Sequence, residues 1–177
     1  GDPALADPKD APAFHWYDAP GWAGCGACLD VKANYLLLVD NLLDLSHLAF
    51  LHIKTIGAAD DTSPHLTWER QGNLLRGVRV ARNIAPSQRQ IAQGDNLRTD
   101  STKIMTFTAP ANVVIEISAV EAGKSEDDPT NRVNRKLVVL DSMTPETETS
   151  CHYFWGNCRN YAIDDAAVTE MVLKSTS

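Results

Sequence analysis

The sequence lacks any uninterrupted apolar run long enough to form a membrane-spanning helix. Such a helix needs about 18 or more consecutive apolar residues, but Asp40 and Asp44 interrupt the longest leucine-rich stretch. The first residues also lack the basic and apolar segments that make up a secretory signal. We therefore expect a soluble, cytoplasmic protein that makes no contact with a membrane.

Basic residues are scarce relative to acidic ones. The 177 residues include 16 Lys and Arg against 23 Asp and Glu, which gives a net charge of −7 and a pI near 5.1. Proteins that bind the phosphate backbone of nucleic acids need clustered Lys and Arg, so we predict no nucleic-acid partner. A hydrophobic content of 44% is sufficient for the core of a single domain of this length.

Cysteine is limited to four residues, which are Cys25, Cys28, Cys151 and Cys158. A Cys-x-x-Cys pair with a distant second pair leaves a structural zinc module open as a hypothesis. The spacing of the second pair is wider than that of a zinc knuckle. In a reducing cytoplasm we expect four free, partly buried thiols instead.

The segment from Asp40 to His52 places two carboxylates, an amide and two imidazoles in an otherwise leucine-rich stretch. Neutral imidazole is the commonest protein ligand for divalent transition metals. Two histidines and one carboxylate form the usual metal-binding triad of non-haem Fe(II) oxygenases. The pattern therefore indicates a metal site in which His47 and His52 are two of the ligands.

The spacing of these side chains limits the local structure. His47 and His52 are five residues apart, so an ideal helix would place them about 140° apart around its axis, and the helix must distort or end between them. Asn41, Asp44 and His47 are three apart and share a face, which lets the Asp44 carboxylate orient an imidazole N–H. From spacing alone, a core helix whose histidines find ordinary hydrogen-bond partners is an equal alternative.

A longer run around this segment resembles the iron-binding motif of Rieske non-haem iron oxygenases. The run extends from Asn34 to His47 and is closed by Phe50-Leu51-His52. The resemblance is strongest to the group of vanillate O-demethylase, dicamba O-demethylase and toluenesulfonate methyl-monooxygenase. The opening residues 1–8 and the late stretch 144–165 resemble the same group.

The resemblance implies a role for each residue of the motif. His47 and His52 bind the mononuclear Fe(II), Asn41 lies beside the metal, and Asp44 bridges toward the [2Fe-2S] Rieske cluster of a neighbouring subunit. The third ligand of the family is a carboxylate on a C-terminal helix, and we place that position beyond Ser177.

A Rieske cluster needs paired Cys-x-His and Cys-x-x-His motifs in this family, and no cysteine here has a histidine at either offset. The resemblance therefore implies that the Rieske domain is absent from this chain. Residues 1–20 are interpreted as the linker from that domain. Residues 21–177 are interpreted as the non-haem iron catalytic domain, incomplete at its C-terminus.

The middle of the chain alternates apolar and polar residues, which is typical of half-buried antiparallel strands. We predict a strand-like entry over 32–39, then a helix to about His52. We also predict a final helix capped by Asp164 or Asp165, with Ala167, Val168, Met171 and Val172 on its apolar face. Together these elements predict an α+β fold, an antiparallel β-sheet with helices. The resemblance implies the helix-grip (START/Bet v 1-like) form of it. The expected strands are 66–69, 74–81, 104–108, 113–119, 133–141 and 149–155.

Four arginines occur close together around one predicted strand, at Arg76, Arg79, Arg82 and Arg89. Alternating arginines usually mark the solvated face of a strand, with Val78 and Val80 on the other side. The alternative is that one of them binds an aromatic acid through two parallel hydrogen bonds.

The resemblance implies a terminal oxygenase that hydroxylates a methyl or methoxy group of an aromatic acid with O2, most simply as an O-demethylase. Electrons would come from NAD(P)H through a separate reductase or ferredoxin, and the intact enzyme would be a homotrimer. We expect substrate contacts at Ile115, Asp141 and Met143 from their strand positions. The alternative function is a metal-free helix-grip domain that binds an apolar or aromatic ligand without catalysis.

Overall fold

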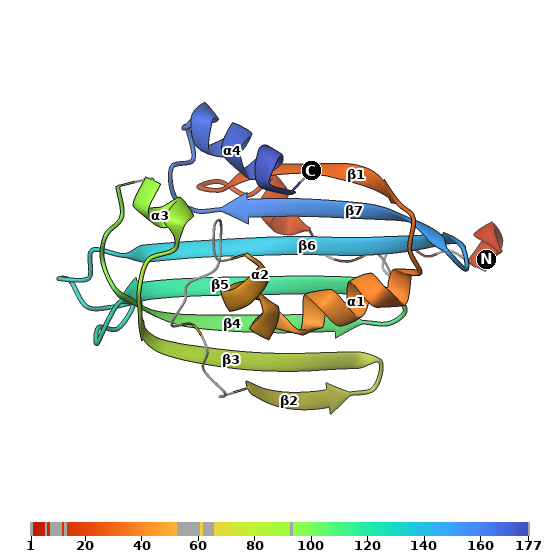
Figure 1. Ribbon diagram of the computed structural model, residues 1–177, viewed down its shortest axis with the longest axis horizontal. Helices are drawn as coiled ribbons and strands as arrows, with labels where there is room; N and C mark the ends of the chain where they lie inside the picture. The colour runs from red at the N-terminus through yellow and green to blue at the C-terminus, as the bar shows by residue number, and fades with distance from the viewer. Residues whose placement is uncertain are drawn as a thin grey trace.

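The alternating segments pair into one seven-stranded antiparallel sheet, with the strands in the order β1-β7-β6-β5-β4-β3-β2 (Figure 1). The computed structural model describes residues 2–5, 7, 12, 14–52, 61, 66–92 and 94–176. The predicted α+β class is confirmed. The strands are β1 (Ala23–Val31), β2 (Leu66–Gln71), β3 (Leu74–Ile84), β4 (Thr99–Thr108), β5 (Asn112–Glu121), β6 (Asn134–Thr147) and β7 (Ser150–Arg159).

One face of the sheet, here called the inner face, carries the row Asn157, Val139, Ile115 and Met105, which are partners in successive strands. Helix α1 (Tyr35–Leu43) covers the middle of this face and packs Val39 against a cluster that includes Met105 and Ile115. The short helices α2 (Leu48–Leu51) and α3 (Gln88–Ala92) are the remaining described α-helices besides α4 (Ala166–Thr176).

Helix α4 begins as predicted from its capping residue. The Asp165 side chain accepts hydrogen bonds from the backbone N–H groups of Ala167 (2.9 Å) and Val168 (3.3 Å). Its buried face presents Val172, which packs with Cys25 and Trp155 on the inner face of β1 and β7. The predicted apolar face of the last helix is therefore confirmed at Val168 and Val172, which are both buried. Met171 is half-buried, and the prediction is wrong for Ala167, which is exposed.

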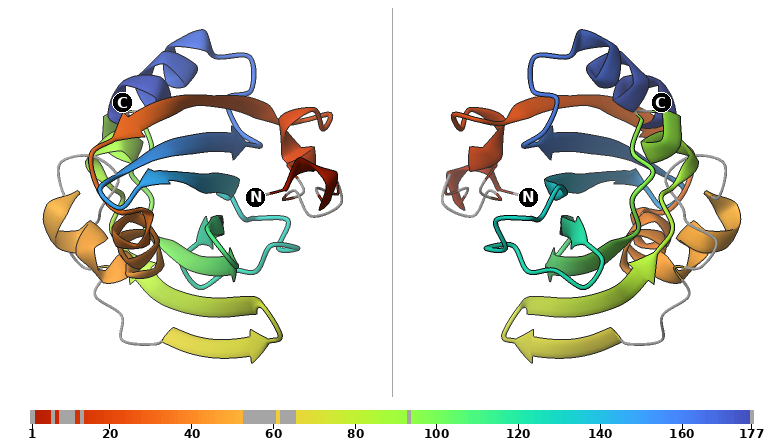
Figure 2. Two further views of the ribbon diagram at one scale, coloured as in Figure 1. Left: turned by 90° about the vertical axis from the view of Figure 1, so that its right-hand side faces the viewer. Right: turned by 90° about the vertical axis from the view of Figure 1, so that its left-hand side faces the viewer.

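The N-terminal segment lies on the outer face of the sheet, opposite α1 and α2 (Figure 2). Trp16 and Trp22 pack there against a buried cluster of Val138, Leu140 and Cys158. A Cβ atom at Gly24 or Gly156 would come within 3.2 Å of the Tyr17 ring, so the two glycines let this ring lie directly on the strands. Aromatic residues thus hold the segment that we interpreted as a linker against the outer face of the sheet.

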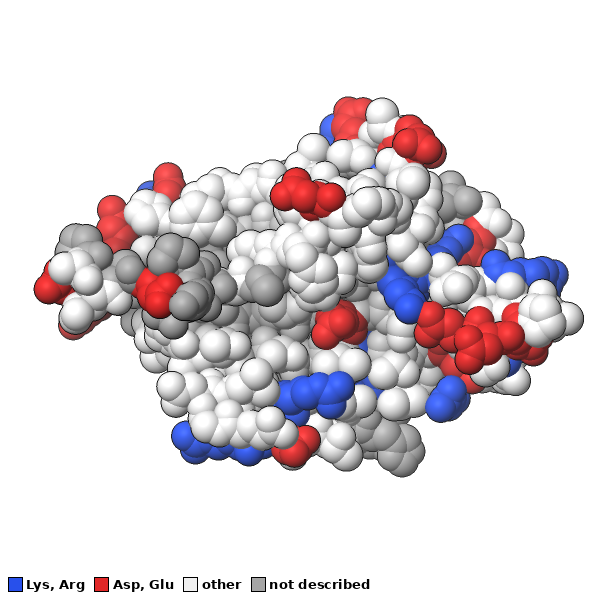
Figure 3. All heavy atoms as spheres, turned by 180° about the vertical axis from the view of Figure 1, so that it is seen from behind, with Lys and Arg blue, Asp and Glu red and all other residues white. Residues whose placement is uncertain are grey.

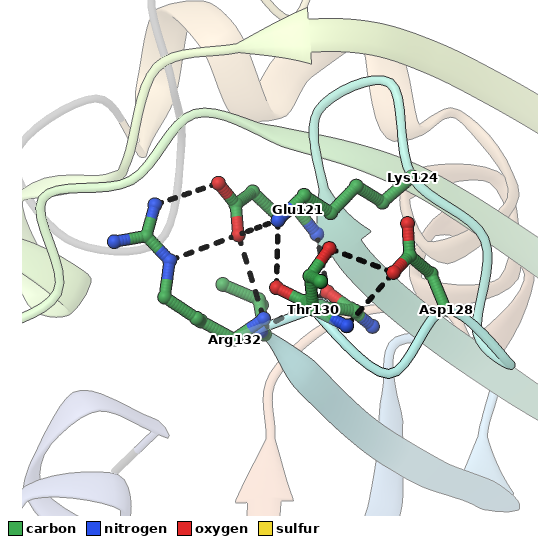
Figure 4. A network of polar contacts seen from close by, with 7 residues as sticks. Glu121, Lys124, Asp128, Thr130 and Arg132 are labelled. Atoms are coloured by element: carbon green, nitrogen blue, oxygen red, sulfur yellow. Dashed lines mark hydrogen bonds and ion pairs between the residues drawn. The ribbon is translucent and has the colours of Figure 1, made fainter.

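Charged side chains of both signs lie interspersed on the face seen in Figure 3. At one end of the strands, the connection from β5 to β6 is held by Glu121, which accepts hydrogen bonds from Arg132 Nη2 (2.7 Å) and Lys124 Nζ (3.0 Å) (Figure 4). These bonds, led by that from Arg132, lower the pKa of Glu121 to about 2.

Among the described residues, no helix is long and apolar enough to cross a membrane.

The predicted strand-like entry over 32–39 is wrong. The strand ends at Val31, and Tyr35 already begins α1. The reason is local, because the Asn34 side chain accepts a hydrogen bond from the backbone N–H of Leu36 at 3.0 Å and so caps the helix. A short leucine-rich run has no period that separates a buried strand from a buried helix.

The predicted alternation in β3 is present, but its orientation is the reverse of the expected one. Arg79 lies on the inner face, with only 4% of its surface exposed, and not on a solvated face. Arg76 and Arg82 are exposed, as expected for the other arginines of this strand. Burial of Arg79 is possible because Asp61 forms an ion pair with it at 3.0 Å.

Candidate metal centre

The segment that carries the two histidines is broken into three short helical pieces. Helix α1 ends at Leu43, and Asp44 leaves helical geometry with φ −93° and ψ 83°. Its Oδ1 accepts a hydrogen bond from the backbone N–H of Ser46 at 3.0 Å and starts a 3₁₀ turn over Leu45–His47. Helix α2 then ends at Leu51, so the predicted end of the helix between His47 and His52 is confirmed.

This break brings the two imidazoles together. The ring centroids of His47 and His52 lie 5.2 Å apart with an interplanar angle of 66°. His47 Nδ1 contacts the backbone carbonyl oxygen of Asp44. Since a carbonyl can only accept, the proton of the neutral ring is on Nδ1, which leaves Nε2 as the nitrogen available to a metal.

The carboxylate of Asp44 does not perform the orienting role that the spacing predicted. It binds both the backbone N–H and the hydroxyl of Ser46, and the Asp44 carbonyl holds His47 instead. The hydrogen bond from the Ser46 hydroxyl is the main reason that the pKa of Asp44 is lowered from its ordinary value. The physical cause is the 3₁₀ turn, which directs the Asp44 carboxylate to the backbone of its own turn.

Both histidines line a cavity of about 340 Å³ between the helical segment and the inner face of the sheet. This volume lies in the range of pockets for small organic ligands. Its walls are mainly aliphatic, from Leu42, Leu45 and Leu48 on the helical side and from Ile115, Ile117, Leu137 and Val139 on the sheet. The polar side chains that line it include Asn41, Gln90, Lys103, Arg135, Asp141, Tyr153 and Asn157.

The residues predicted to contact the substrate, to lie beside the metal or to bridge toward the cluster do not all line the cavity. Asn41, Ile115 and Asp141 line the cavity. Met143 is not among the lining residues and is buried in the core under α1 with Val39. Asp44 also does not line the cavity.

Asp141 is the most deeply buried acid of the cavity wall, with 1% of its surface exposed. Its Oδ1 accepts a hydrogen bond of 2.6 Å from the Tyr153 hydroxyl. Burial raises the pKa of Asp141 to about 7, although the bond from Tyr153 opposes this shift. The carboxyl group is therefore present in both protonation states near neutral pH.

A buried ion cluster, which sequence reasoning missed, forms another part of the wall. Lys103 and Arg79 are opposite partners on β4 and β3, and both form ion pairs with Asp61. Arg79 Nη1 also donates a hydrogen bond of 3.5 Å to the carbonyl of Leu45, in the turn that carries His47. Burial is the main cause that lowers the pKa of Lys103. Of these three residues, Lys103 and Asp61 line the cavity.

Comparison with known proteins now identifies the family. A sequence model of the vanillate O-demethylase oxygenase C-terminal domain matches residues 31–177. The chain belongs to this family.

Individual relatives of this vanillate O-demethylase-type domain agree. The vanillate O-demethylase oxygenase subunit of a Pseudomonas species is 33% identical over 97% of this chain and 54% of its own length. The toluene-4-sulfonate monooxygenase system iron-sulfur subunit TsaM1 of Comamonas testosteroni is 30% identical, over 97% of this chain and 51% of its own length. The chain spans about half the length of these relatives.

Solved structures agree on the fold. A crystal structure of dicamba monooxygenase bound to 3,6-dichlorosalicylic acid matches with a TM-score of 0.85 at 29% identity, over 99% of this chain and 50% of that one. Dicamba monooxygenase with non-haem iron and dicamba matches with a TM-score of 0.72 at 28% identity, over 94% of this chain and 46% of that one. The helix-grip catalytic fold predicted for this domain is thereby confirmed.

The histidine pair of the vanillate O-demethylase-type domain fits two positions of an iron site. The two rings are adjacent, both line one cavity, and the Nδ1 contact of His47 leaves its Nε2 for a metal. Within the described ranges, no group of three His, Cys, Asp or Glu side chains converges on one metal position. The described residues therefore bring together two imidazoles that could hold a metal.

The cysteines do not have the arrangement that the zinc hypothesis needs. Cys25 is buried on the inner face against Trp155 and Val172. Cys28 is exposed and lies three positions later in the same strand, so the two side chains point to opposite faces of the sheet. A Cys-x-x-Cys chelate is therefore excluded by the geometry of β1. All four cysteines are free thiols.

Proposed function

We propose that this domain is the catalytic part of a terminal oxygenase that hydroxylates a methyl or methoxy group of an aromatic acid with O2 at mononuclear Fe(II). O-demethylation is the reaction we expect. The observation that carries the proposal is the pair of adjacent imidazoles at the wall of a cavity of about 340 Å³. Membership of the vanillate O-demethylase oxygenase family supports it.

We assign iron binding to His47 and His52, with a third, carboxylate ligand beyond Ser177. Bound Fe(II) would supply the activation of O2 and the oxidation of a carbon–hydrogen bond. The contact of His47 Nδ1 with the Asp44 carbonyl favours the tautomer that leaves Nε2 for the metal, and it orients the ring. The aliphatic wall around Ile115 and Val139 excludes water and holds an aromatic ring.

The charge of the cavity supports an aromatic acid as the substrate. Lys103 lines the cavity and is paired with Asp61, which also forms an ion pair with Arg79. A carboxylate or sulfonate on the substrate would be a second acceptor for the Lys103 ammonium group. None of the four arginines considered from the sequence is among the described lining residues, whereas Lys103 and Arg135 are.

The electron supply lies outside the residues of this chain. We propose that a [2Fe-2S] Rieske cluster delivers electrons from NAD(P)H through a reductase or ferredoxin component, with Asp44 as the bridge from a neighbouring subunit of a homotrimer. Names of the relatives, an oxygenase subunit and an iron-sulfur subunit, support a multi-component system. Residues 1–20 are then the linker from the Rieske domain and 21–177 the catalytic domain. A cytoplasmic location remains a prediction and suits the use of NAD(P)H.

The second candidate function is binding of an aromatic or apolar ligand without metal or catalysis. One observation favours it, namely that the cavity is formed by described residues whereas the third metal ligand is not among them. Binding of an aromatic acid to iron-free protein, together with no iron uptake by a longer form of the chain, would establish it.

The experiment that tests the proposal is metal analysis after anaerobic purification with Fe(II), on this chain and on a longer form with the residues before Gly1 and after Ser177. We expect near-stoichiometric iron in the longer form and its loss in His47→Ala and in His52→Ala. The matched control is His152→Ala, because His152 is paired with Asp30 at 2.8 Å on the outer face. Unchanged iron content in both variants, or equal loss in the control, contradicts the assignment.

A further inference from the structure

One lysine side chain is buried at the wall of the cavity. Lys103 lies on the inner face of β4 and lines the cavity. Its side chain is 11% exposed, whereas those of Lys124, Lys136 and Lys174 are 24%, 42% and 74% exposed. Lysine is almost never buried to this extent without a specific arrangement of partners, so the surroundings of Lys103 indicate what its amine can do.

Burial and a neighbouring cation act against the charged form of Lys103. Arg79 is its directly opposite partner on β3, and both side chains form ion pairs with Asp61. Burial is the main cause that lowers the pKa of Lys103; the charge of Arg79 adds to this shift and the contact with Asp61 opposes it. A lysine in an apolar pocket beside a second cation is the arrangement that activates the amine as a nucleophile for carbonyl compounds.

The space beside Lys103 suits an aromatic ring. Ile117 is the opposite partner of Lys103 on β5, and it lines the cavity together with Ile115, Val139 and Leu45. The cavity of about 340 Å³ lies in the size range of sites for small organic molecules. A small aromatic molecule can therefore place its ring on the aliphatic wall with a substituent directed at Lys103.

We propose that Lys103 forms a reversible covalent imine with aromatic aldehydes that enter the cavity. The apolar wall holds the ring, and Nζ of Lys103 attacks the carbonyl carbon. Asp61, which contacts this ammonium group, moves the protons. This activity goes beyond the proposed oxygenase function, because it needs neither iron nor O2.

The atoms and charges of the step balance. Asp61 takes a proton from the Lys103 ammonium group, and the Nζ lone pair forms a bond to the carbonyl carbon while the carbonyl π electrons move to oxygen. A proton then moves from nitrogen to this oxygen. Asp61 returns its proton to the resulting hydroxyl, which leaves as water while the nitrogen lone pair completes the C=N bond. No oxidant or reductant is consumed.

The imine also preserves the charges of the buried cluster. Its protonated form carries the same single positive charge as the ammonium group that it replaces, so the ion pair with Asp61 is kept. An adduct that neutralised the nitrogen would remove one partner of a buried ion pair, which is costly. The cluster of Lys103, Asp61 and Arg79 is therefore more compatible with an imine than with a neutral modification of the lysine.

The test is reductive trapping of the metal-free chain with benzaldehyde and cyanoborohydride at about pH 7, followed by mass spectrometry of its peptides. Cyanoborohydride converts the imine into a stable benzyl amine. The exposed Lys174 is the internal reference. We expect Lys103 to be labelled at least about tenfold faster than Lys174, because each unit by which a lysine pKa is lowered raises the fraction of free amine about tenfold. Labelling of Lys103 at an equal or lower rate than Lys174 overturns the proposal.

Two variants show whether the aldehyde reaches Lys103 through the cavity. Ile117→Phe narrows the space beside Lys103 and should slow its labelling relative to Lys174 at least about threefold, because the aldehyde is displaced from the amine. The matched control is Ser118→Phe, one residue along β5 on the opposite face, which should keep the wild-type ratio. An unchanged ratio in Ile117→Phe, or an equal loss in the control, contradicts a site in the cavity; the wild-type ratio decides the proposal even if a variant does not fold.

The outcome is separate from the iron assignment, because the trapping experiment uses no metal. Selective labelling of Lys103 together with no iron binding by the longer form would support this site and contradict the oxygenase proposal. Normal iron binding without selective labelling would overturn the imine and leave the oxygenase proposal standing.

Discussion

The two walls of the cavity differ in how their chemistry is encoded. The helical wall, residues 35–52, carries Asn41, His47 and His52 within one short segment, and local turns set their positions. The sheet wall, which is the inner face of β3 to β7, carries Lys103, Asp141 and Asn157 on three different strands. A contiguous motif can be recognised in a sequence, whereas a wall assembled from paired strands depends on their register.

The walls also differ in how they tolerate charge. The helical wall carries two imidazoles, and the Asp44 carbonyl contacts Nδ1 of His47. The sheet wall instead buries an ion cluster at Lys103 and a single acid at Asp141. The charge of Lys103 is balanced by Asp61, whereas the Asp141 carboxyl accepts a hydrogen bond from Tyr153. The contrast leads to four predictions, in order of expected size.

The largest effect is expected where Lys103 and Arg79 lose their shared partner Asp61. Asp61→Asn leaves Lys103 and Arg79 buried as two adjacent cations, which should reduce the free energy of unfolding by about 3–5 kcal/mol. Urea unfolding of the variant measures this loss. The double variant Asp61→Asn/Lys103→Met should recover part of it, since one cation has been removed. A loss below about 1 kcal/mol would show that solvent screens the cluster.

A gain of stability is expected at Asp141. Its pKa is raised to about 7 from about 3.9 in the unfolded chain, so the folded state binds more protons, and stability falls as the pH rises from about 4 to 7. Asp141→Asn keeps an acceptor for Tyr153 and removes the ionisation. The variant should be about 2–4 kcal/mol more stable than the wild type at pH 8, with little difference at pH 4, as measured by unfolding at the two pH values. Equal differences at both would contradict burial of the ionised acid.

A functional effect with little change of stability is expected on the helical wall at Asp44. Asp44→Asn keeps an oxygen that can accept from Ser46, so the turn before His47 and the iron content should be retained. If Asp44 bridges toward the cluster, steady-state oxygenation in the longer form should fall at least about tenfold, which corresponds to about 1.4 kcal/mol. Single turnover driven from the reduced cluster at the wild-type rate would rule out the bridging role.

The smallest effect is expected at the start of the helical wall. Asn34→Ala removes the cap of α1 and its bond of 3.0 Å to the carbonyl of Glu148, which should cost about 1 kcal/mol. Thermal unfolding gives the value, and Asp165→Ala, which removes the cap of α4, is the matched comparison. A cost above about 3 kcal/mol would mean that Asn34 supports more than the helix end.

Several elements could be predicted because their signals are local. The alternation of apolar and polar residues predicted the approximate positions of β2 to β7. The Asp165 cap, followed by Val168 and Val172, predicted α4. The interruption between His47 and His52 followed from the angle between positions five apart. The strand predicted over residues 32–39 was wrong for an equally local reason. A run of leucines suits a buried strand as well as a buried helix, and the cap formed by Asn34 stabilises the helix.

The sequence by itself determined the metal-ligand candidates, the strand alternation and, through its motifs, the oxygenase family. Only the tertiary structure decided which side of β3 faces inward, since the ion pair of Arg79 with Asp61 joins residues 18 apart in the chain. It also placed Met143 in the core and brought Asp141 and Asn157 to one end of the cavity. The physical reason is that the energy of a buried charge or polar atom depends on partners from other strands, and no local pattern records which strands become neighbours.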